Sequence, residues 1–276
     1  MFAACAVPSA LFFISSAYVP ESPRWLVKAG KDAKAARILA RIGGDSYSKA
    51  ALSEIKASLV NEDAHVRFGE LFEPRVMVVL GLGIFLAVFQ QWCGINVIFN
   101  YAEEIFAAAG YNISDTLMNI AWTGSVNMAF TFVALGIVDR GGRRPLMLFG
   151  FASLAVIYIA MGWCYQSGVK GLPMLLLVLT AIACYAMSLA PVVWVIISEI
   201  FPNRIRGAAM SVAVCALWIA CFLLTFTFPQ MNARLGPAGT FWTYAGICAI
   251  GFIFVKLRLP ETKGKTLEEI EKELVD

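Results

Sequence analysis

Gln90-Gln91-Trp92-Cys93-Gly94-Ile95-Asn96 places three carboxamide side chains inside a long apolar run. Residues 76–89 before it carry no charge, and residues 97–99 after it are again apolar. The whole run exceeds the roughly 20 apolar residues that a membrane-spanning helix needs. An amide without a hydrogen-bond partner in lipid costs several kcal/mol, so such groups face a bundle interior or a wet cavity. The run therefore predicts a membrane helix with a polar site inside it.

Gly94 predicts that this helix bends or unwinds, because glycine tolerates backbone conformations that other residues avoid. Broken helices in membrane proteins line cavities. Amides are neutral and offer both hydrogen-bond donors and acceptors, which suits a polyhydroxylated ligand better than an ion. The alternative is that the three amides only link one helix to another.

The composition indicates a polytopic membrane protein with an all-α fold. Of its 276 residues, 59% are hydrophobic and only 15% are charged, against about 25% charged residues in a soluble domain. The net charge is +3 with the basic residues in loops, so no nucleic-acid partner is indicated. The seven cysteines lie in apolar segments without a Cys-x-x-Cys motif, and the single histidine forms no metal cluster. No nucleotide-binding loop or catalytic triad is present, so we expect neither an enzyme nor a cofactor.

The hydropathy pattern predicts seven spans and two polar segments. The spans are residues 1–19, 76–99 with a continuation to 109, 117–138, 146–165, 172–200, 208–229 and 240–259. Residues 20–75 are expected to form a cytoplasmic helical linker, 76–259 a six-helix bundle, and 260–276 a cytoplasmic tail. In the linker, residues 31–42 and 46–60 predict two amphipathic helices, the first with Ala35, Ile38, Leu39 and Ile42 on one face. The first span has no basic leader, so we expect preceding sequence to be missing.

Basic residues set the expected orientation. Of the 22 lysines and arginines, only Lys170 and Arg234 lie in loops on one side, and all others lie in segments on the opposite side. Positively charged loops stay in the cytoplasm. We therefore expect a multi-pass protein of the cell membrane, either plasma or inner, with a cytoplasmic carboxy terminus.

Two of the predicted cytoplasmic turns combine acids with arginines. Asp139 precedes Arg143 and Arg144 in one turn, and Glu199 precedes Arg206 in the other. Charges at the same partly buried depth can form an ion-pair network that forms in one transporter state and breaks in another. The alternative is that the arginines only anchor the topology.

Aromatic and polar side chains at helical spacing extend the predicted site. Pro191 predicts a kink, and Trp194 one turn later offers a flat face and an indole donor at mid-depth. Asn127 lies in a polar stripe with Thr123 and Thr131. Trp218 shares a face with Ser211, Cys215 and Phe222, where simple packing is the alternative. Asn100 and Tyr101 follow the predicted break and are candidates for a gate.

These motifs together resemble the sugar porter family of the major facilitator superfamily. The matching motifs, in family order, are Pro20-Glu21-Ser22-Pro23-Arg24, Gln90-Gln91 with Gly94-Ile95-Asn96, Asp139-Arg140 with Gly142-Arg143-Arg144, Pro191 with Trp194, Ser198-Glu199-Ile200-Phe201-Pro202 with Arg206-Gly207, and Pro260-Glu261-Thr262-Lys263-Gly264. They extend over nearly the whole chain, and six motifs in order are highly specific.

The resemblance implies the carboxy-terminal half of a transporter, comprising the sixth helix, the linker and helices seven to twelve. It implies that Gln90, Gln91, Asn96 and Asn127 bind sugar hydroxyls and that Trp194 stacks on the sugar. It also implies that Asp139, Arg143, Glu199 and Arg206 hold the outward-facing state, and the charges of the other motifs, Glu21, Arg24, Arg144 and Glu261, are expected in the same network. Departures at Asn100, Ala190 and Leu217 leave the substrate's identity open.

The predicted function is monosaccharide transport by alternating access, with proton coupling expected. The expected partners are the sugar, the lipid bilayer and the missing amino-terminal half. An inositol or polyol carrier of the same superfamily is the nearest alternative. A transport-inactive sugar-binding fragment or a sensor is the alternative from another class.

Overall fold

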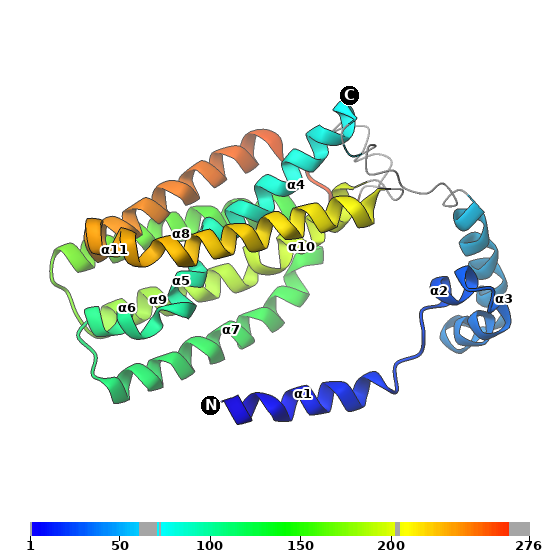
Figure 1. The fold of residues 1–276 in the computed structure, drawn as a ribbon, viewed down its shortest axis with the longest axis horizontal. Helices are drawn as coiled ribbons and strands as arrows, with labels where there is room; N and C mark the ends of the chain where they lie inside the picture. Colours follow the sequence, from blue (N-terminus) through cyan, green and yellow to red (C-terminus); the bar gives the residue numbers. More distant parts are fainter. Residues whose placement is uncertain (1, 61–70, 72, 202–204, 265–276) are drawn as a thin grey trace. The chain divides into compact units, whose positions relative to one another are not determined.

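A computed structural model describes residues 2–60, 71, 73–201 and 205–264, and the regular structure of these residues is helical throughout (Figure 1). The all-α fold predicted from the sequence is therefore confirmed. The chain divides into two compact units, residues 1–65 and 66–276.

The first unit contains α1 (Phe2–Ser16), α2 (Pro23–Lys28) and α3 (Asp32–Val60). Proline suits the start of α2, because the first helical N–H has no partner within the helix. Leu26, Ala35 and Leu39 are buried where α2 packs on α3. Ile42, predicted on the same face as Ala35 and Leu39, is 69% exposed. The helix leaves its regular path two residues later, at Gly44 with φ of 81°.

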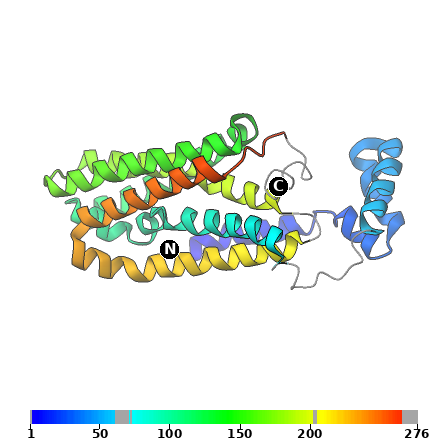
Figure 2. The ribbon, with the colours of Figure 1, turned by 90° about the horizontal axis from the view of Figure 1, so that it is seen from above.

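The second unit begins with a helix that is broken twice. Its elements are α4 (Pro74–Trp92), α5 (Ile95–Asn100), α6 (Ala102–Ala108), α7 (Ile113–Gly141), α8 (Arg143–Gln166), α9 (Leu172–Met187), α10 (Leu189–Ile200) and α11 (Arg206–Arg258). In Figures 1 and 2 these helices run roughly along one direction, as expected of a bundle that crosses a membrane.

The long element α11 contains two of the predicted spans. Its backbone departs from helical geometry at Gly236, with φ of 69°, and the chain reverses direction there (Figure 2). Within the described residues, five helical segments are long and apolar enough to cross a membrane, and Arg206–Arg258 is the longest. Because that segment folds back on itself, the six spans predicted between residues 76 and 259 all have helical counterparts.

The predicted kink near Pro191 is present as the break between α9 and α10. Pro191, in the first turn of α10, has no N–H to bond the carbonyl of Met187, four residues earlier, and this favours a break just before it. The break lies at Ser188, whose hydroxyl donates to the carbonyl of Cys184. The fully buried side chains Phe151 and Tyr158 of α8 fill the centre of the unit, where α8 packs on α9, α10 and α11.

Candidate functional site

The carboxamide cluster is located at the break between α4 and α5. Gln90 and Gln91 occupy the last turn of α4, and Gly94 separates the two helices in a left-handed conformation with φ of 86°. A Cβ atom at Gly94 would lie 2.8 Å from Cγ of Tyr244 on α11. Both the backbone angle and the close ring therefore require glycine at this position. The predicted break is confirmed.

Gln90 is held by a tyrosine that the sequence analysis did not single out. Its Nε2 donates to the hydroxyl of Tyr185 on α9 over 3.0 Å, and its side chain is only 3% exposed. Its carbonyl oxygen is buried and has no hydrogen-bond partner among the described residues. Buried amides normally use their acceptors, so an unpaired one needs an explanation. This oxygen therefore keeps an unused acceptor inside the protein.

A hydrogen bond between the side chains of Gln91 and Asn96 bridges the break between α4 and α5. The Nδ2 group of Asn96 donates to Oε1 of Gln91, and it also approaches the Cys221 sulfur at 3.9 Å. Gln91 is buried, whereas Asn96 is half-buried. The structure thus brings Gln91 and Asn96 together, while Gln90 contacts Tyr185, so part of the hydrogen-bonding capacity of these amides is used within the protein. The Gln90–Tyr185 bond also joins α4 to α9, so the helix-linking alternative holds for that one contact.

The two tryptophans lie on the surface of the unit. Trp194 on α10 is 40% exposed and Trp218 on α11 is 61% exposed. Neither indole has a hydrogen bond to the amide cluster among the described residues. Trp218 instead lines an open cavity of about 440 Å³ together with Ser211 and Cys215, two of the three residues predicted on its face. Both side chains are thus accessible.

The polar stripe on α7 is only partly available to a ligand. The hydroxyl of Thr123 donates to the carbonyl of Ile120, and that of Thr131 donates to the carbonyl of Asn127. Threonines often satisfy themselves on their own helix in this way. The half-buried carboxamide of Asn127 is therefore the group of this stripe best suited to bind another molecule.

The two candidate gate residues differ in how they are held. The Tyr101 hydroxyl donates to the carbonyl of Thr225 over 2.9 Å, and its ring lies 4.5 Å from that of Phe228. These contacts attach the start of α6 to α11. Asn100 is exposed at the end of α5.

Arg143 is the centre of the charged cluster in the second unit. Its Nη2 lies 2.9 Å from Oε1 of Glu199 and 3.4 Å from Oδ1 of Asp139. Its side chain is 12% exposed, while that of Asp139 is 82% exposed. The contact with Glu199 is thus the shorter and the more shielded of the two, and shielded pairs interact more strongly than surface pairs.

The segment after α11 supplies a cap to α8. The carboxylate of Glu261 accepts hydrogen bonds from the backbone N–H groups of Arg143 at 2.9 Å and Arg144 at 3.2 Å. A negative charge is favourable at a helix amino terminus, where N–H groups lack partners. Gly142, with φ of 80°, makes room, because a Cβ there would lie 2.8 Å from the carboxylate. The next residue, Thr262, donates to Glu199 over 2.7 Å.

Two arginines contact backbone carbonyls instead of acids. Arg144 donates through Nη2 to the carbonyl of Lys256 at 2.7 Å. Arg206 donates through Nε to the carbonyl of Phe201 at 3.3 Å. No carboxylate pairs with Arg206 among the residues that the structure describes. Its membership of the ion-pair network stays a prediction.

Glu21 and Arg24 lie in the first unit. Glu21 pairs with Lys34 at 2.7 Å. The hydrogen bond from Lys34, helped by the charges of Lys34 and Lys31, lowers the pKa of the Glu21 carboxyl. Arg24 lies on α2. That either residue joins the charges around Arg143 stays a prediction.

A family model described as "Sugar (and other) transporter" matches residues 1–274, almost the whole chain. The chain belongs to this sugar transporter family. It is 38% identical to the D-xylose-proton symporter of Escherichia coli K12 over 98% of its own length and 56% of that protein. It is 40% identical to the arabinose-proton symporter of Bacillus subtilis strain 168, over 96% of this chain and 57% of that protein.

The fold comparison agrees with the family. A solved structure of a major facilitator proton:xylose symporter bound to 6-bromo-6-deoxy-D-glucose matches all of this chain and 58% of that one. The TM-score is 0.80 at 36% identity. The sugar transporter chain described here spans about half the length of the curated relatives it matches. The family is one of membrane transporters and not of enzymes, as the sequence predicted.

Proposed function

We propose that this chain forms the substrate-binding half of a secondary transporter that moves a monosaccharide, a pentose or a hexose, together with a proton. The observation that carries the proposal is the buried and unpaired carbonyl oxygen of Gln90 beside a broken helix. A neutral acceptor at this depth suits a sugar hydroxyl and gives no charge to hold an ion.

When a sugar binds, the amides can exchange their internal hydrogen bond for hydrogen bonds to the sugar. The hydrogen bond between Asn96 and Gln91 lies within the protein, and a sugar hydroxyl can insert into it, because a hydroxyl can accept from Nδ2 of Asn96 while it donates to Oε1 of Gln91. Asn127 contributes a further amide, and the accessible rings of Trp194 and Trp218 stack on the sugar. Binding should be modest, about −4 to −8 kcal/mol, because a carrier must also release its substrate.

The conformational change requires the amino-terminal half of the same transporter as a partner. In alternating access one bundle rocks against the other around a central site. The contacts of Arg143 with Glu199 and Asp139, and the cap from Glu261, act as a latch at one end of the bundle. Asn100 and Tyr101 gate the site from the broken helix. The carboxy terminus lies in the cytoplasm, on the side with the greater number of basic residues.

Uptake of radiolabelled sugars by cells that lack their own pentose carriers tests the proposal. The full-length gene product should carry D-xylose or L-arabinose inward, and a proton uncoupler should abolish accumulation. Uptake that survives the uncoupler indicates facilitated diffusion. Transport of myo-inositol but of no pentose or hexose indicates the polyol alternative, and sugar binding without any uptake indicates a sensor.

A further inference from the structure

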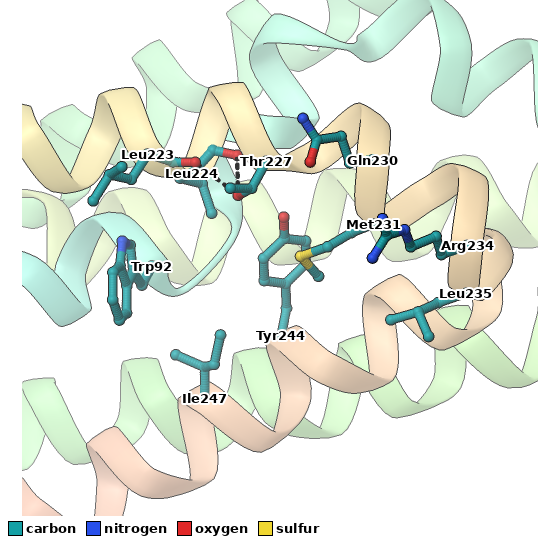
Figure 3. Close-up of a pocket in the computed structure, with 10 residues that line it drawn as sticks. All are labelled: Trp92, Leu223, Leu224, Thr227, Gln230, Met231, Arg234, Leu235, Tyr244 and Ile247. Carbon is teal, nitrogen blue, oxygen red and sulfur yellow. Dashed lines mark hydrogen bonds between the residues drawn. The ribbon is translucent and has the colours of Figure 1, made fainter.

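A second cavity, separate from the amide cluster, lies between the end of α4 and the two passes of α11 (Figure 3). Its volume is about 570 Å³, within the range of small-molecule sites. Most of its walls are apolar, and they come from Trp92, Leu223, Leu224, Met231, Leu235 and Ile247. None of the predicted sugar-binding amides lines it. We call this cavity the α11 groove.

One end of the α11 groove carries a cation. Arg234 is exposed and lies in the last turn before the reversal at Gly236. It has no ion pair or hydrogen bond among the described residues of the chain. Figure 3 shows its guanidinium turned toward Met231, along the groove wall, with the amide of Gln230 nearby. The groove thus has an unpaired positive charge at one end and an apolar wall along its length.

The length of the groove matches one leaflet of a bilayer. Leu223 and Arg234 both line it and are eleven residues apart on α11. At about 1.5 Å per residue, this separation corresponds to roughly 16 Å. The hydrocarbon core of a bilayer is about 30 Å thick, so half of it is about 15 Å. With Arg234 at headgroup level, the apolar wall extends to the middle of the membrane.

A polar atom in the wall also lacks a partner. Tyr244 is 1% exposed, and its hydroxyl has no hydrogen bond among the residues described. Figure 3 shows this hydroxyl directed from one pass of α11 toward the other, between Thr227 and Met231. The Thr227 hydroxyl donates to the carbonyl of Leu223. This hydroxyl is enclosed by the protein, so an occupant of the groove would meet the ring of Tyr244 and not its hydroxyl.

We propose that the α11 groove binds one molecule of an anionic phospholipid. Its acyl chain lies along the apolar wall, and its phosphate pairs with Arg234. A sugar does not fit, because its hydroxyls would face side chains that offer few hydrogen bonds. An anionic headgroup supplies the missing partner for the guanidinium. An occupant would contact Trp92 and Tyr244, which also adjoin the helix break at Gly94.

Native mass spectrometry of the purified full-length gene product, titrated with phosphatidylglycerol or phosphatidylcholine, tests this site. The wild type should bind phosphatidylglycerol several-fold more tightly than phosphatidylcholine. Arg234→Gln should weaken phosphatidylglycerol binding about fivefold and remove the preference, the change expected from one basic side chain near an anionic lipid. Lys170→Gln, which removes the other cation assigned to this side, is the matched control and should keep the preference.

A groove-filling variant provides an independent measurement. Leu223 lines the groove and is 42% exposed, so Leu223→Trp should displace the lipid without disturbing the core. Retained lipid in this variant, or an unchanged preference in Arg234→Gln, would overturn the proposal. So would cross-linking of a Met231→Cys variant to a second copy or to another protein helix. If Leu223→Trp does not fold, the comparison of Arg234→Gln with Lys170→Gln still decides.

Discussion

Replacing Gly94 with alanine should destabilise the helix break that positions the amide cluster. The backbone of Gly94 is left-handed, with φ of 86°. This conformation costs a non-glycine residue roughly 1–2 kcal/mol. The new Cβ would lie 2.8 Å from Cγ of Tyr244. Overpacking of this kind costs roughly 1–3 kcal/mol.

The two costs together predict a loss of about 2–5 kcal/mol in the free energy of unfolding of Gly94→Ala. Denaturant titration in detergent, followed by circular dichroism, measures this loss. The control Gly81→Ala lies in the same helix α4, where no atom is near the new Cβ. It should be neutral or more stable by roughly 0.5–1 kcal/mol.

A double variant separates the two causes. Tyr244→Leu combined with Gly94→Ala should recover the packing part of the loss but not the backbone part. If Gly94→Ala unfolds with the same free energy as Gly81→Ala, the break does not depend on glycine and the reasoning fails.

Three more predictions concern individual side-chain contacts. Glu261→Gln removes the charge that caps α8 and should cost about 1 kcal/mol in unfolding experiments. Asp139→Asn removes the exposed pair with Arg143 and should cost only a few tenths of that free energy of unfolding. Equal losses in Glu261→Gln and Asp139→Asn would contradict the capping role of Glu261. Tyr185→Phe removes the hydroxyl that holds an amide of α4 and should weaken sugar binding about fivefold in calorimetry, with little change in helicity. Lys34→Gln should raise the pKa of Glu21 in an NMR titration. Because that pKa is lowered in the folded protein, the pair with Lys34 stabilises the first unit at pH values above the ordinary carboxyl pKa. This stabilisation is lost as the pH falls through the lowered pKa of Glu21. An unchanged titration of Glu21 in the variant would refute the assignment.

The spans and the breaks could be predicted because they depend on composition and on single residues. Hydropathy gives the six passes between residues 76 and 259 whatever their packing. Gly94 and Pro191 act locally, through a permitted backbone angle in one case and a missing N–H in the other. Their effects therefore appear in the sequence.

Contacts between distant segments could not be predicted in the same way. Tyr185 lies in an apolar run and resembles a packing residue until α9 brings it to Gln90, 95 positions earlier. Glu261 resembles one more member of a charge cluster until its carboxylate is found on the backbone of α8. Ile42 fits an amphipathic pattern, but the pattern does not show that α3 bends at Gly44. Tertiary packing decides each of these.

The central claim is that neutral amides at the α4–α5 break bind a sugar. Isothermal titration of the full-length gene product with D-xylose and L-arabinose tests it most directly. Asn96→Ala should raise the dissociation constant at least tenfold, which corresponds to about 1.4 kcal/mol. Thr131→Ala, whose hydroxyl bonds to its own helix, should leave the dissociation constant unchanged. Equal sugar affinity in wild type, Asn96→Ala and Gln91→Ala would contradict the claim.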